Sequence, residues 1–493
     1  MKRRIVMSAL AAVALVATSC GSDSDSGSEG SSPASSTAVA ATDASAATGS
    51  SAATETSAAT DSSAATESSA ASESSAATDS SAGTESSESS ENSGVGNDPV
   101  PFSDSNKFKA DIDRTGETIK IGVTNDEGAT FTVPEQRVGI LTAIDYINAN
   151  GGVNGAQLEP DVCISDATPD GAINCANQFV EDGVDLVTYG AEINIDAALK
   201  IYEDADIAVI SDYAYNQTPS DHVWALTSPA ASFSLYTLVT LKDLGSTKPA
   251  FLPIDAPVFH YHADIFPKWA AKIGIDSTVG PFVDASTADW SSAVQSVLAD
   301  DADSLVYFGP SNGAVSIVTA ARQIGFDGPI ITTDPGYATS VDEADTQNNY
   351  VISPRFQSVA AAEAAPERVQ QNLAAYVQAM TDAGHADLIA GYAENQFATT
   401  VDIATILETI PEGPINFETV SAALSQDRSL PGFDAPDFNC GSASFPAFPS
   451  FCRGYQLPMK MSRSGDELTF SLVKEENGGI YNDLALNAES VNL

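Results

Sequence analysis

The sequence predicts an α/β protein with two lobes, each a parallel β-sheet with helices on both faces. A strand, a loop, a helix, a glycine stop and a second strand follow one another between residue 118 and the apolar run that begins at Leu158. The same alternation then recurs in two sets, and a β-rich segment from Arg453 ends the chain. Alternating strands and helices favour parallel sheets, which helices cover on both faces.

The first strand–helix–strand unit has clear boundaries. Residues 119–123 form an apolar run of strand length, and Pro134 stands where a first helical turn tolerates a missing N–H. Ile140, Ile144 and Ile147 recur at helical spacing, which predicts one buried stripe. A glycine pair at residues 151–152 then ends the helix.

Later segments continue this pattern. Apolar runs predict strands at residues 162–164, 186–189, 207–210, 250–254, 278–282, 305–308, 330–332 and 350–352. Helices are expected at residues 170–182, 195–204, 263–272, 290–300, 313–324, 366–383 and 390–409, and a hairpin at residues 455–461 and 467–474. We therefore assign residues 106–228 and 354–452 to lobe one, and residues 229–353 and 453–493 to lobe two.

Residues 1–19 predict a lipoprotein signal peptide. Three basic residues precede an apolar run, residues 5–17, that is too short to span a bilayer comfortably. The small residues before Cys20 resemble the lipobox of bacterial lipoproteins, in which the cysteine is lipidated. A plain secretory signal with an incidental cysteine is the alternative. No later segment has the length and apolarity of a transmembrane helix, so we expect an extracytoplasmic protein held at the cell membrane by its N-terminal lipid.

Residues 20–105 are rich in Ser, Ala, Thr and acidic residues, and residues 51–86 contain six related hexads. Nothing large and apolar is available to bury, so this segment is predicted to be a disordered tether. A glycosylated stalk is also compatible with the composition.

The charge balance excludes some partners. The chain has 21 basic and 67 acidic residues, a formal net charge of −46. A general nucleic-acid binder needs a cationic face, so no nucleic-acid partner is expected. The same surplus of acid argues against electrostatic docking on anionic lipid.

Four cysteines besides Cys20 allow three disulfide connectivities. We favour the local pairs, Cys163 with Cys175 and Cys440 with Cys452, because each closes a short segment. Such a loop closure contributes on the order of 3 kcal/mol. A four-cysteine zinc site is the alternative, but the sequence lacks a CxxC knuckle.

An ordered set of motifs carries a family resemblance. It comprises IKIGV at residues 119–123, YINANGGVNG at 146–155, IYEDADIAVIS at 201–211, DADSLVYFG at 301–309 and ARQIGFDGPIITT at 321–333. From residue 118 onward the chain resembles type I periplasmic solute-binding proteins, the branched-chain amino-acid and amide receptors of ABC transporters. The resemblance implies a monomer without enzymatic activity, metal or cofactor. It would capture a small amino-acid-like or amide solute between two lobes and deliver it to an ABC permease. A ligand-sensing receptor without transport is the alternative.

Ligands of open parallel sheets bind outside the carboxyl ends of the strands. The loops at those ends are residues 124–132, 190–194 and 211–217 in lobe one, and 255–260, 309–312 and 334–337 in lobe two. From these loops and the resemblance, the predicted ligand-binding residues are Phe131, Glu192, Asn194, Ser211, Tyr213, Ala214, Tyr215, Phe259, Ser311, Asp334 and Tyr337.

Glu192 stands in a loop that is often Ser-rich in that family. A glutamate facing the ligand would repel the carboxylate of an amino acid. This feature favours a cationic, amide or aromatic solute over the standard branched-chain amino acids.

Two motifs suggest other chemistry. Residues 309–313 fit G-x-S-x-G, and Asp334 and His385 follow in hydrolase order, so Ser311 is a candidate nucleophile. Pro310 and the lack of an oxyanion-hole motif argue against this serine hydrolase. His260 and His262 suggest a metal site, but their segment is interpreted as a loop entering a helix, with the two side chains exposed or lining a cleft.

Overall fold

The computed structural model describes residues 112–128, 132–212, 220–284, 287–299, 301–356, 359–389, 391–442, 450–465 and 467–473. The predicted signal peptide, Cys20 and the tether lie outside these residues. The same holds for Phe131, Tyr213, Ala214 and Tyr215 among the predicted ligand contacts.

The first sheet contains five parallel strands in the order β2-β1-β3-β4-β5. Its strands are β1 (Thr118–Asp126), β2 (Gln157–Ser165), β3 (Leu186–Tyr189), β4 (Ala208–Ser211) and β5 (Val223–Ala225). Because the strands are parallel, their carboxyl ends share one edge of the sheet. We call the sheet with its helices lobe one.

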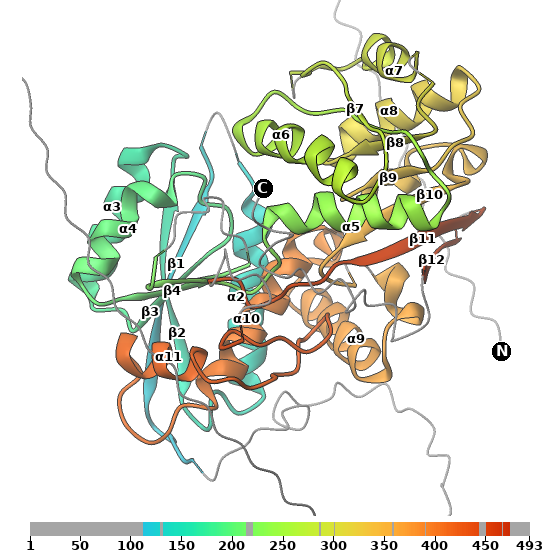
Figure 1. Ribbon diagram of the computed structural model, residues 1–493. Coiled ribbons are helices and arrows are strands. Elements are labelled where there is room, and N and C mark those ends of the chain that lie inside the picture. The colour runs from blue at the N-terminus through green and yellow to red at the C-terminus, as the bar shows by residue number, and fades with distance from the viewer. Residues whose placement is uncertain are drawn as a thin grey trace, which may run out of the picture. The chain divides into compact units, whose positions relative to one another are not determined.

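Helices cover both faces of this sheet. Apolar residues of α3 (Pro169–Asp182) and α4 (Ile195–Asp204) form one buried cluster with β3 and β4. Those of α2 (Pro134–Ala149), α10 (Tyr392–Leu407) and α11 (Phe417–Leu424) form another with β1. Figure 1 labels β1, β2, β3 and β4 of this sheet, beside α3 and α4. The helices α2 and α10 approach closely at Gly139, where a Cβ would lie 2.2 Å from the carbonyl oxygen of Ala393.

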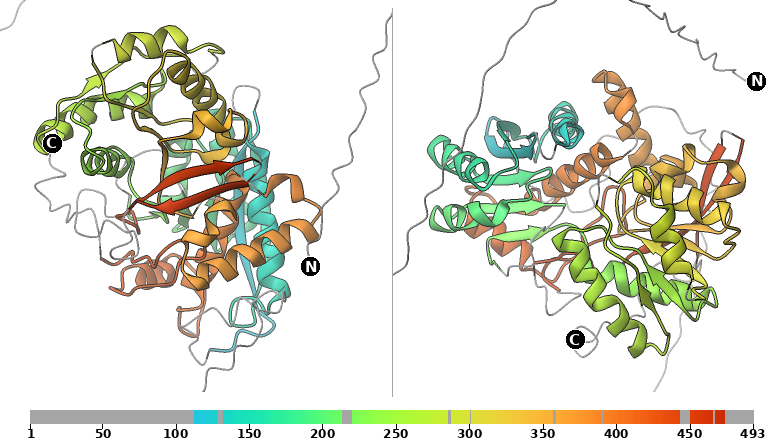
Figure 2. Two further views of the ribbon diagram at one scale, coloured as in Figure 1. Left: turned by 90° about the vertical axis from the view of Figure 1, so that its right-hand side faces the viewer. Right: turned by 90° about the horizontal axis from the view of Figure 1, so that it is seen from above.

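The second sheet has the order β12-β11-β10-β9-β8-β6-β7. Its parallel strands are β6 (Pro249–Phe251), β7 (Thr278–Val279), β8 (Ser304–Tyr307), β9 (Ile330–Thr332) and β10 (Asn349–Ser353). An antiparallel hairpin of β11 (Leu457–Ser464) and β12 (Glu467–Leu472) extends it, and the two strands lie side by side in Figure 2. We call this sheet with its helices lobe two.

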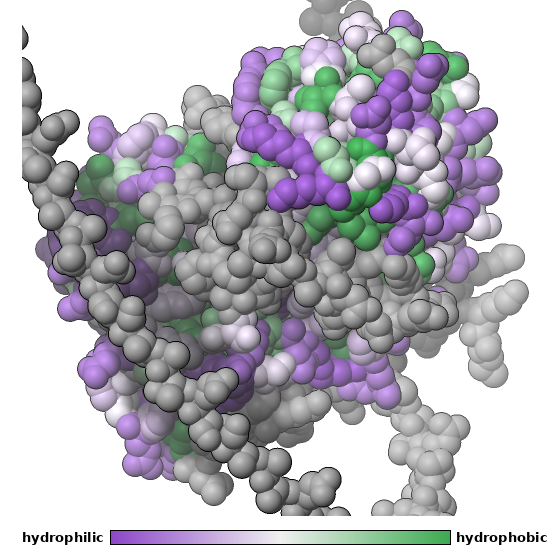
Figure 3. All heavy atoms as spheres, in the orientation of Figure 1, coloured by the Kyte–Doolittle hydropathy of each residue, from purple (hydrophilic) through white to green (hydrophobic). Residues whose placement is uncertain are grey.

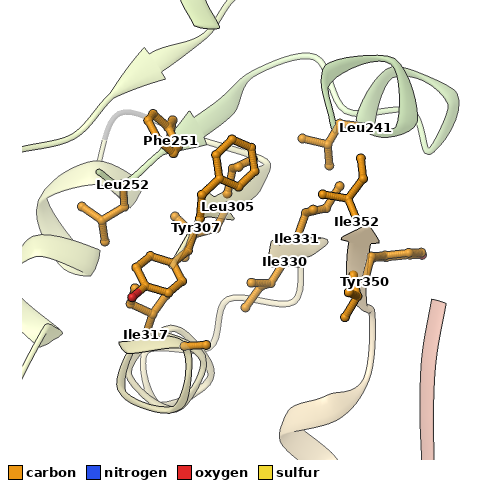
Figure 4. Close-up of a cluster of buried hydrophobic side chains, with 14 of the residues drawn as sticks. Leu241, Phe251, Leu252, Leu305, Tyr307, Ile317, Ile330, Ile331, Tyr350 and Ile352 are labelled. Atoms are coloured by element: carbon orange, nitrogen blue, oxygen red, sulfur yellow. The ribbon is translucent and has the colours of Figure 1, made fainter. Parts of the chain in front are cut away.

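A single apolar cluster holds lobe two together. It joins the strands to α5 (Ala230–Asp243), α6 (Pro257–Lys272), α7 (Ser291–Leu298) and α8 (Ser311–Gln323). Figure 4 shows Leu305, Tyr307 and Ile331 of the strands within this cluster, with Ile317 of α8. Helix α9 (Glu367–Asp382) contributes residues to the clusters of both lobes. The short 3-10 helices are η1 (Pro335–Thr339), η2 (Glu343–Thr346), η3 (Val359–Ala364) and η4 (Ala386–Leu388).

The α/β fold with two parallel-sheet cores confirms the prediction, and several boundaries differ. The segment of His260 and His262 lies within α6, so its interpretation as a loop is wrong. Pro257 begins that helix at a position where a missing N–H is tolerated. Strand β5 and helices α5 and α11 have no counterpart among the predicted elements.

The chain passes between the two lobes three times. We call residues 226–229, 354–356 and 452–456 the three crossovers. They follow β5, follow β10 and precede β11, respectively. Segments far apart in the sequence therefore meet between the lobes.

The structure confirms both local disulfides. Cys163 bonds to Cys175 and Cys440 bonds to Cys452, each across a sequence separation of 12. The first ties β2 to α3, and the second ends at the third crossover.

No helix in the described part of the chain is long and apolar enough to cross a bilayer. On the face drawn in Figure 3, much of the described surface is hydrophilic, with apolar residues in patches between.

Candidate ligand-binding site

In lobe one, hydrogen bonds of the Asn125 side chain hold two strand-end loops together. The Asn125 side chain accepts a hydrogen bond from the Ala191 N–H (2.9 Å) and donates one to the Val133 carbonyl (3.0 Å). Gly190 permits this approach, since a Cβ there would lie 2.2 Å from Asn125 Oδ1. The loop after β3 is thus attached to the end of β1.

Two carboxyl groups lie buried beneath this loop. Asp126 Oδ2 accepts from the Ile193 N–H (2.8 Å), and Glu192 Oε2 accepts from the Thr124 hydroxyl (3.1 Å). Burial, together with the negative charge of Asp126, raises the pKa of Glu192 to about 7. Burial also raises the pKa of Asp126. Glu192 is 1 % exposed, and its bond to Thr124 of β1 shows that the side chain points into lobe one.

Two other predicted lobe-one contacts, Ser211 and Asn194, are described, and Asp212 lies next to Ser211 in the sequence. The Ser211 hydroxyl donates to the Tyr189 carbonyl at 2.8 Å and is fully buried. Asn194 precedes α4 and is half-buried. Asp212, directly after β4, is buried and pairs with Arg355 at 2.8 Å. Of these three, only Asn194 is partly exposed.

In lobe two, Asp334 organises the strand-end loops. Its Oδ1 accepts from the Gly336 N–H (2.8 Å) and its Oδ2 from the Ser311 N–H (3.1 Å). One carboxylate therefore caps both η1 and α8, whose first N–H groups lack helical partners. Asp334 and Ser311 are half-buried.

Two further lobe-two candidates are aromatic. Phe259 lies in the first turns of α6 and packs partly buried against the core of lobe two. Tyr337 is fully buried in that core. The structure therefore brings Ser311 and Asp334 together and places Tyr337 among apolar residues.

Tyr392 is influenced by charged groups of both lobes and was not among the predicted residues. It begins α10 in lobe one, after Gly391. Burial and then the negative charges of Asp334 in lobe two and Glu135 in α2 raise the pKa of Tyr392 to about 12. The pKa of Tyr307 at the end of β8 is also raised. Burial is the largest cause, and the negative charges of Tyr392 and Asp334 are the next. No local motif marks Tyr392, because its neighbours come from distant segments.

The geometry does not assemble the serine hydrolase suggested by residues 309–313. None of the hydrogen bonds between described residues joins Ser311 to a histidine, and His385 lies directly before η4. A buried serine–histidine contact does occur elsewhere, between Ser234 of α5 and His262 of α6 at 2.8 Å. Its histidine is enclosed by Phe251, Phe308 and other rings, and burial lowers the pKa of His262 to about 3. A substrate has no access to this pair.

The suggested metal site is not assembled either. His260 is exposed and bonds to Asp255 at 2.7 Å, whereas His262 points into the core. Within the described ranges, no group of three or more His, Cys, Asp or Glu side chains could hold a metal ion.

Comparisons with known proteins agree with this architecture. A family model described as "periplasmic binding protein" matches residues 118–442. The chain is 41% identical over 110 residues to a leucine-, isoleucine-, valine-, threonine- and alanine-binding protein of Pseudomonas aeruginosa. That match spans 21% of this chain and 29% of the relative.

Solved structures show the same fold at low sequence identity. One is a branched-chain amino acid transporter substrate-binding protein from Streptococcus pneumoniae in complex with isoleucine (TM-score 0.55, 18% identity, 72% of this chain and 99% of that one). Another is a solute-binding protein from R. palustris in complex with 4-hydroxybenzoate (TM-score 0.56, 14% identity, 72% and 95%). With the family match over most of the folded part, the chain belongs to the periplasmic binding protein family.

Proposed function

We propose that this protein captures a small amino-acid-like or amide solute between its two lobes and delivers it to an ABC permease. It does no chemistry on the solute. Binding to one lobe followed by closure of the other requires that the solute has a higher affinity for the closed state.

The observation that carries this proposal is the placement of Asp334, whose carboxylate bonds to the Ser311 and Gly336 N–H groups at the carboxyl ends of the lobe-two strands, where open α/β sheets bind ligands. Besides burial, the negative charges of Asp334 in lobe two and Glu135 in lobe one both help to raise the pKa of Tyr392, which supports a site that includes residues of both lobes. A carboxylate, a phenol and helix N-termini supply the acceptors and donors that an amino acid or amide needs. The predicted contacts of Asn194, Phe259, Ser311 and Asp334 remain part of this proposal, whereas the Ser211 hydroxyl is buried and donates to the Tyr189 carbonyl.

The burial of Glu192 bears on the class of solute. A glutamate turned into lobe one, with its pKa raised to about 7, presents less negative charge to a ligand than an exposed carboxylate would. Zwitterionic amino acids therefore stay among the candidates, beside amides and small aromatic acids. The relative from Pseudomonas aeruginosa is named for five amino acids of this kind.

The proposal includes extracytoplasmic attachment through lipidated Cys20 and a monomeric state. Two disulfides support an oxidising compartment, because reducing cytosol disfavours such bonds. Metabolic labelling with a fatty acid would test the anchor, and loss of label in Cys20→Ser is the expected result.

A thermal-shift panel tests the binding function directly. The full chain is heated with amino acids, amides, ureas and small aromatic acids in turn. A solute at a hundred times its dissociation constant should stabilise the fold by about 2.7 kcal/mol. No shift with any compound would contradict the proposal.

The variant Tyr392→Phe tests where the solute binds. Loss of one hydroxyl contact should weaken binding about tenfold, which corresponds to about 1.4 kcal/mol. Thermal unfolding without solute should hardly change. The matched control is Tyr350→Phe, a tyrosine of β10 whose hydroxyl bonds to Asn348 at 3.1 Å. It should leave the affinity unchanged.

A further inference from the structure

A fully buried arginine lies at the second crossover. Arg355 bonds to Asp212 through Nε (3.1 Å) and Nη2 (2.8 Å), and Nη2 also donates to the Thr399 hydroxyl (2.7 Å). Its Nη1 donates to Asp434 at 2.5 Å. One side chain thus joins the end of β4, helix α10 and the segment before the third crossover.

A second buried arginine lies at the third crossover. Arg453 Nη2 donates to Asp402 of α10 at 2.7 Å, and its guanidinium lies 5.1 Å from the ring centre of Phe438. Asp402 also lies 3.7 Å from Arg355 Nη1, so one carboxylate faces both arginines.

Both arginines meet at the first crossover. Arg355 Nη2 donates to the Leu226 carbonyl oxygen (3.3 Å), and Arg453 Nη1 donates to the same atom. Direct bonds reinforce the junction. The Arg453 N–H donates to the Thr227 carbonyl (3.2 Å) and the Ser228 hydroxyl to the Tyr455 carbonyl (2.6 Å). All three crossovers therefore converge on one backbone oxygen.

The charges at this junction depend on one another. Arg355, Arg453, Asp212, Asp402 and Asp434 are each at most 2 % exposed in their side chains. Buried ions are costly to desolvate and are tolerated when paired, so removing one partner leaves an uncompensated charge. Apolar side chains could also hold the crossovers together, but they would lack the directional hydrogen bonds that the two arginines make.

We propose that Arg355 and Arg453 are positioning residues for solute capture, because they hold the three crossovers together and so set how the two lobes face each other. This inference rests on the proposed function. Both arginine side chains are at most 1 % exposed, so neither is placed to contact the solute. They affect solute capture because they hold the crossovers, and the lobes can move relative to each other only by bending at the crossovers.

Hydrogen exchange measured by mass spectrometry on the full chain tests the junction without any solute. In Arg355→Lys, a lysine keeps the charge but cannot reach Asp212, Asp434 and Leu226 together. Amides of residues 226–228 and 452–456, both distant from position 355 in the sequence, should exchange at least tenfold faster. Asp212→Asn removes one partner and serves as a second variant where Arg355→Lys does not fold.

Arg114→Lys is the matched control. Arg114 is equally buried, but it donates to the Pro411 carbonyl (2.7 Å) and the Gly413 carbonyl (2.8 Å) within lobe one. In this control, faster exchange should be confined to the amides of residues 112–117 and 412–413. Two results would overturn the inference. One is unchanged exchange at the crossovers in both Arg355→Lys and Asp212→Asn. The other is that Arg114→Lys increases exchange at the crossovers by the same factor.

Calorimetric titration with L-leucine separates positioning from mere structural support. The dissociation constant should change at least fivefold in Arg355→Lys and less than twofold in Arg114→Lys. Loosened crossovers with unchanged affinity would overturn the positioning role. A wild-type chain that binds nothing in the solute panel would instead contradict the proposed function, and the exchange data would still decide whether the arginines hold the crossovers.

Discussion

The two lobes hold the polar groups at their strand ends in different ways. In lobe one, Asn125, Asp126 and Glu192 are at most 1 % exposed, and their hydrogen bonds join the end of β1 to the loop after β3. In lobe two, Asp334 and Ser311 are half-buried, and one carboxylate caps two helix starts. This difference indicates that the edge of lobe one is fixed by its own contacts, whereas lobe two keeps polar groups within reach of solvent and solute.

The largest expected effect is at Asn125. Asn125→Ala should lower the free energy of unfolding by roughly 3 kcal/mol, because the Ala191 N–H and the Val133 carbonyl lose their partners inside lobe one. Urea unfolding followed by circular dichroism measures it. Asp334→Ala is the counterpart in lobe two and should cost only about 1 to 2 kcal/mol, since water can replace a half-exposed cap. Equal losses in the two variants would remove the distinction between the lobes.

The second effect is a pH dependence at Glu192. A carboxyl whose pKa is raised in the folded state favours the protonated form, so its contribution to stability falls as the pH rises from about 4.5 toward about 7. Glu192→Gln stays neutral and should gain on the order of 2 kcal/mol relative to the wild type between pH 4.5 and pH 8. Unfolding at both pH values measures this gain.

The exposed Glu181 of α3 provides the control for this measurement. Glu181→Gln should leave the pH dependence of stability unchanged. A Glu192→Gln profile parallel to that of the wild type would show that the buried carboxyl does not hold an additional proton.

The smallest effect is expected at Ser311. Ser311→Ala keeps the backbone N–H that bonds to Asp334, so stability should change by no more than about 0.5 kcal/mol. Neither the wild type nor this variant should hydrolyse p-nitrophenyl esters. Turnover that Ser311→Ala abolishes would make the protein an enzyme and would contradict solute capture without chemistry.

Local patterns predicted much of the fold. Helix α4 and strand β9 have the predicted bounds, because an amphipathic stripe and a short β-branched run are local signals. Helix α5 was missed for the opposite reason. Residues such as Ser234, Tyr236 and Leu238 are buried around much of its circumference, so no polar face marks a period of 3.6.

The candidate site was less predictable, because its geometry depends on contacts between distant segments. Parallel strands indicated the correct edge of each sheet, and Ser311 and Asp334 do lie together there. Nothing near Glu192 in the sequence shows that it turns into lobe one, toward Thr124 and Asp126. The partners of Arg355 likewise come from positions 212, 402 and 434, and an isolated arginine is normally expected at the surface.

The Leu226 carbonyl has a consequence for how this chain can vary. Every amino acid supplies a main-chain oxygen, so side-chain changes at position 226 preserve the acceptor. No other amino acid has the planar, forked guanidinium group of arginine, so positions 355 and 453 tolerate few substitutions. An engineer who builds a biosensor on this scaffold could therefore adjust its response through the first crossover while leaving both guanidinium groups in place.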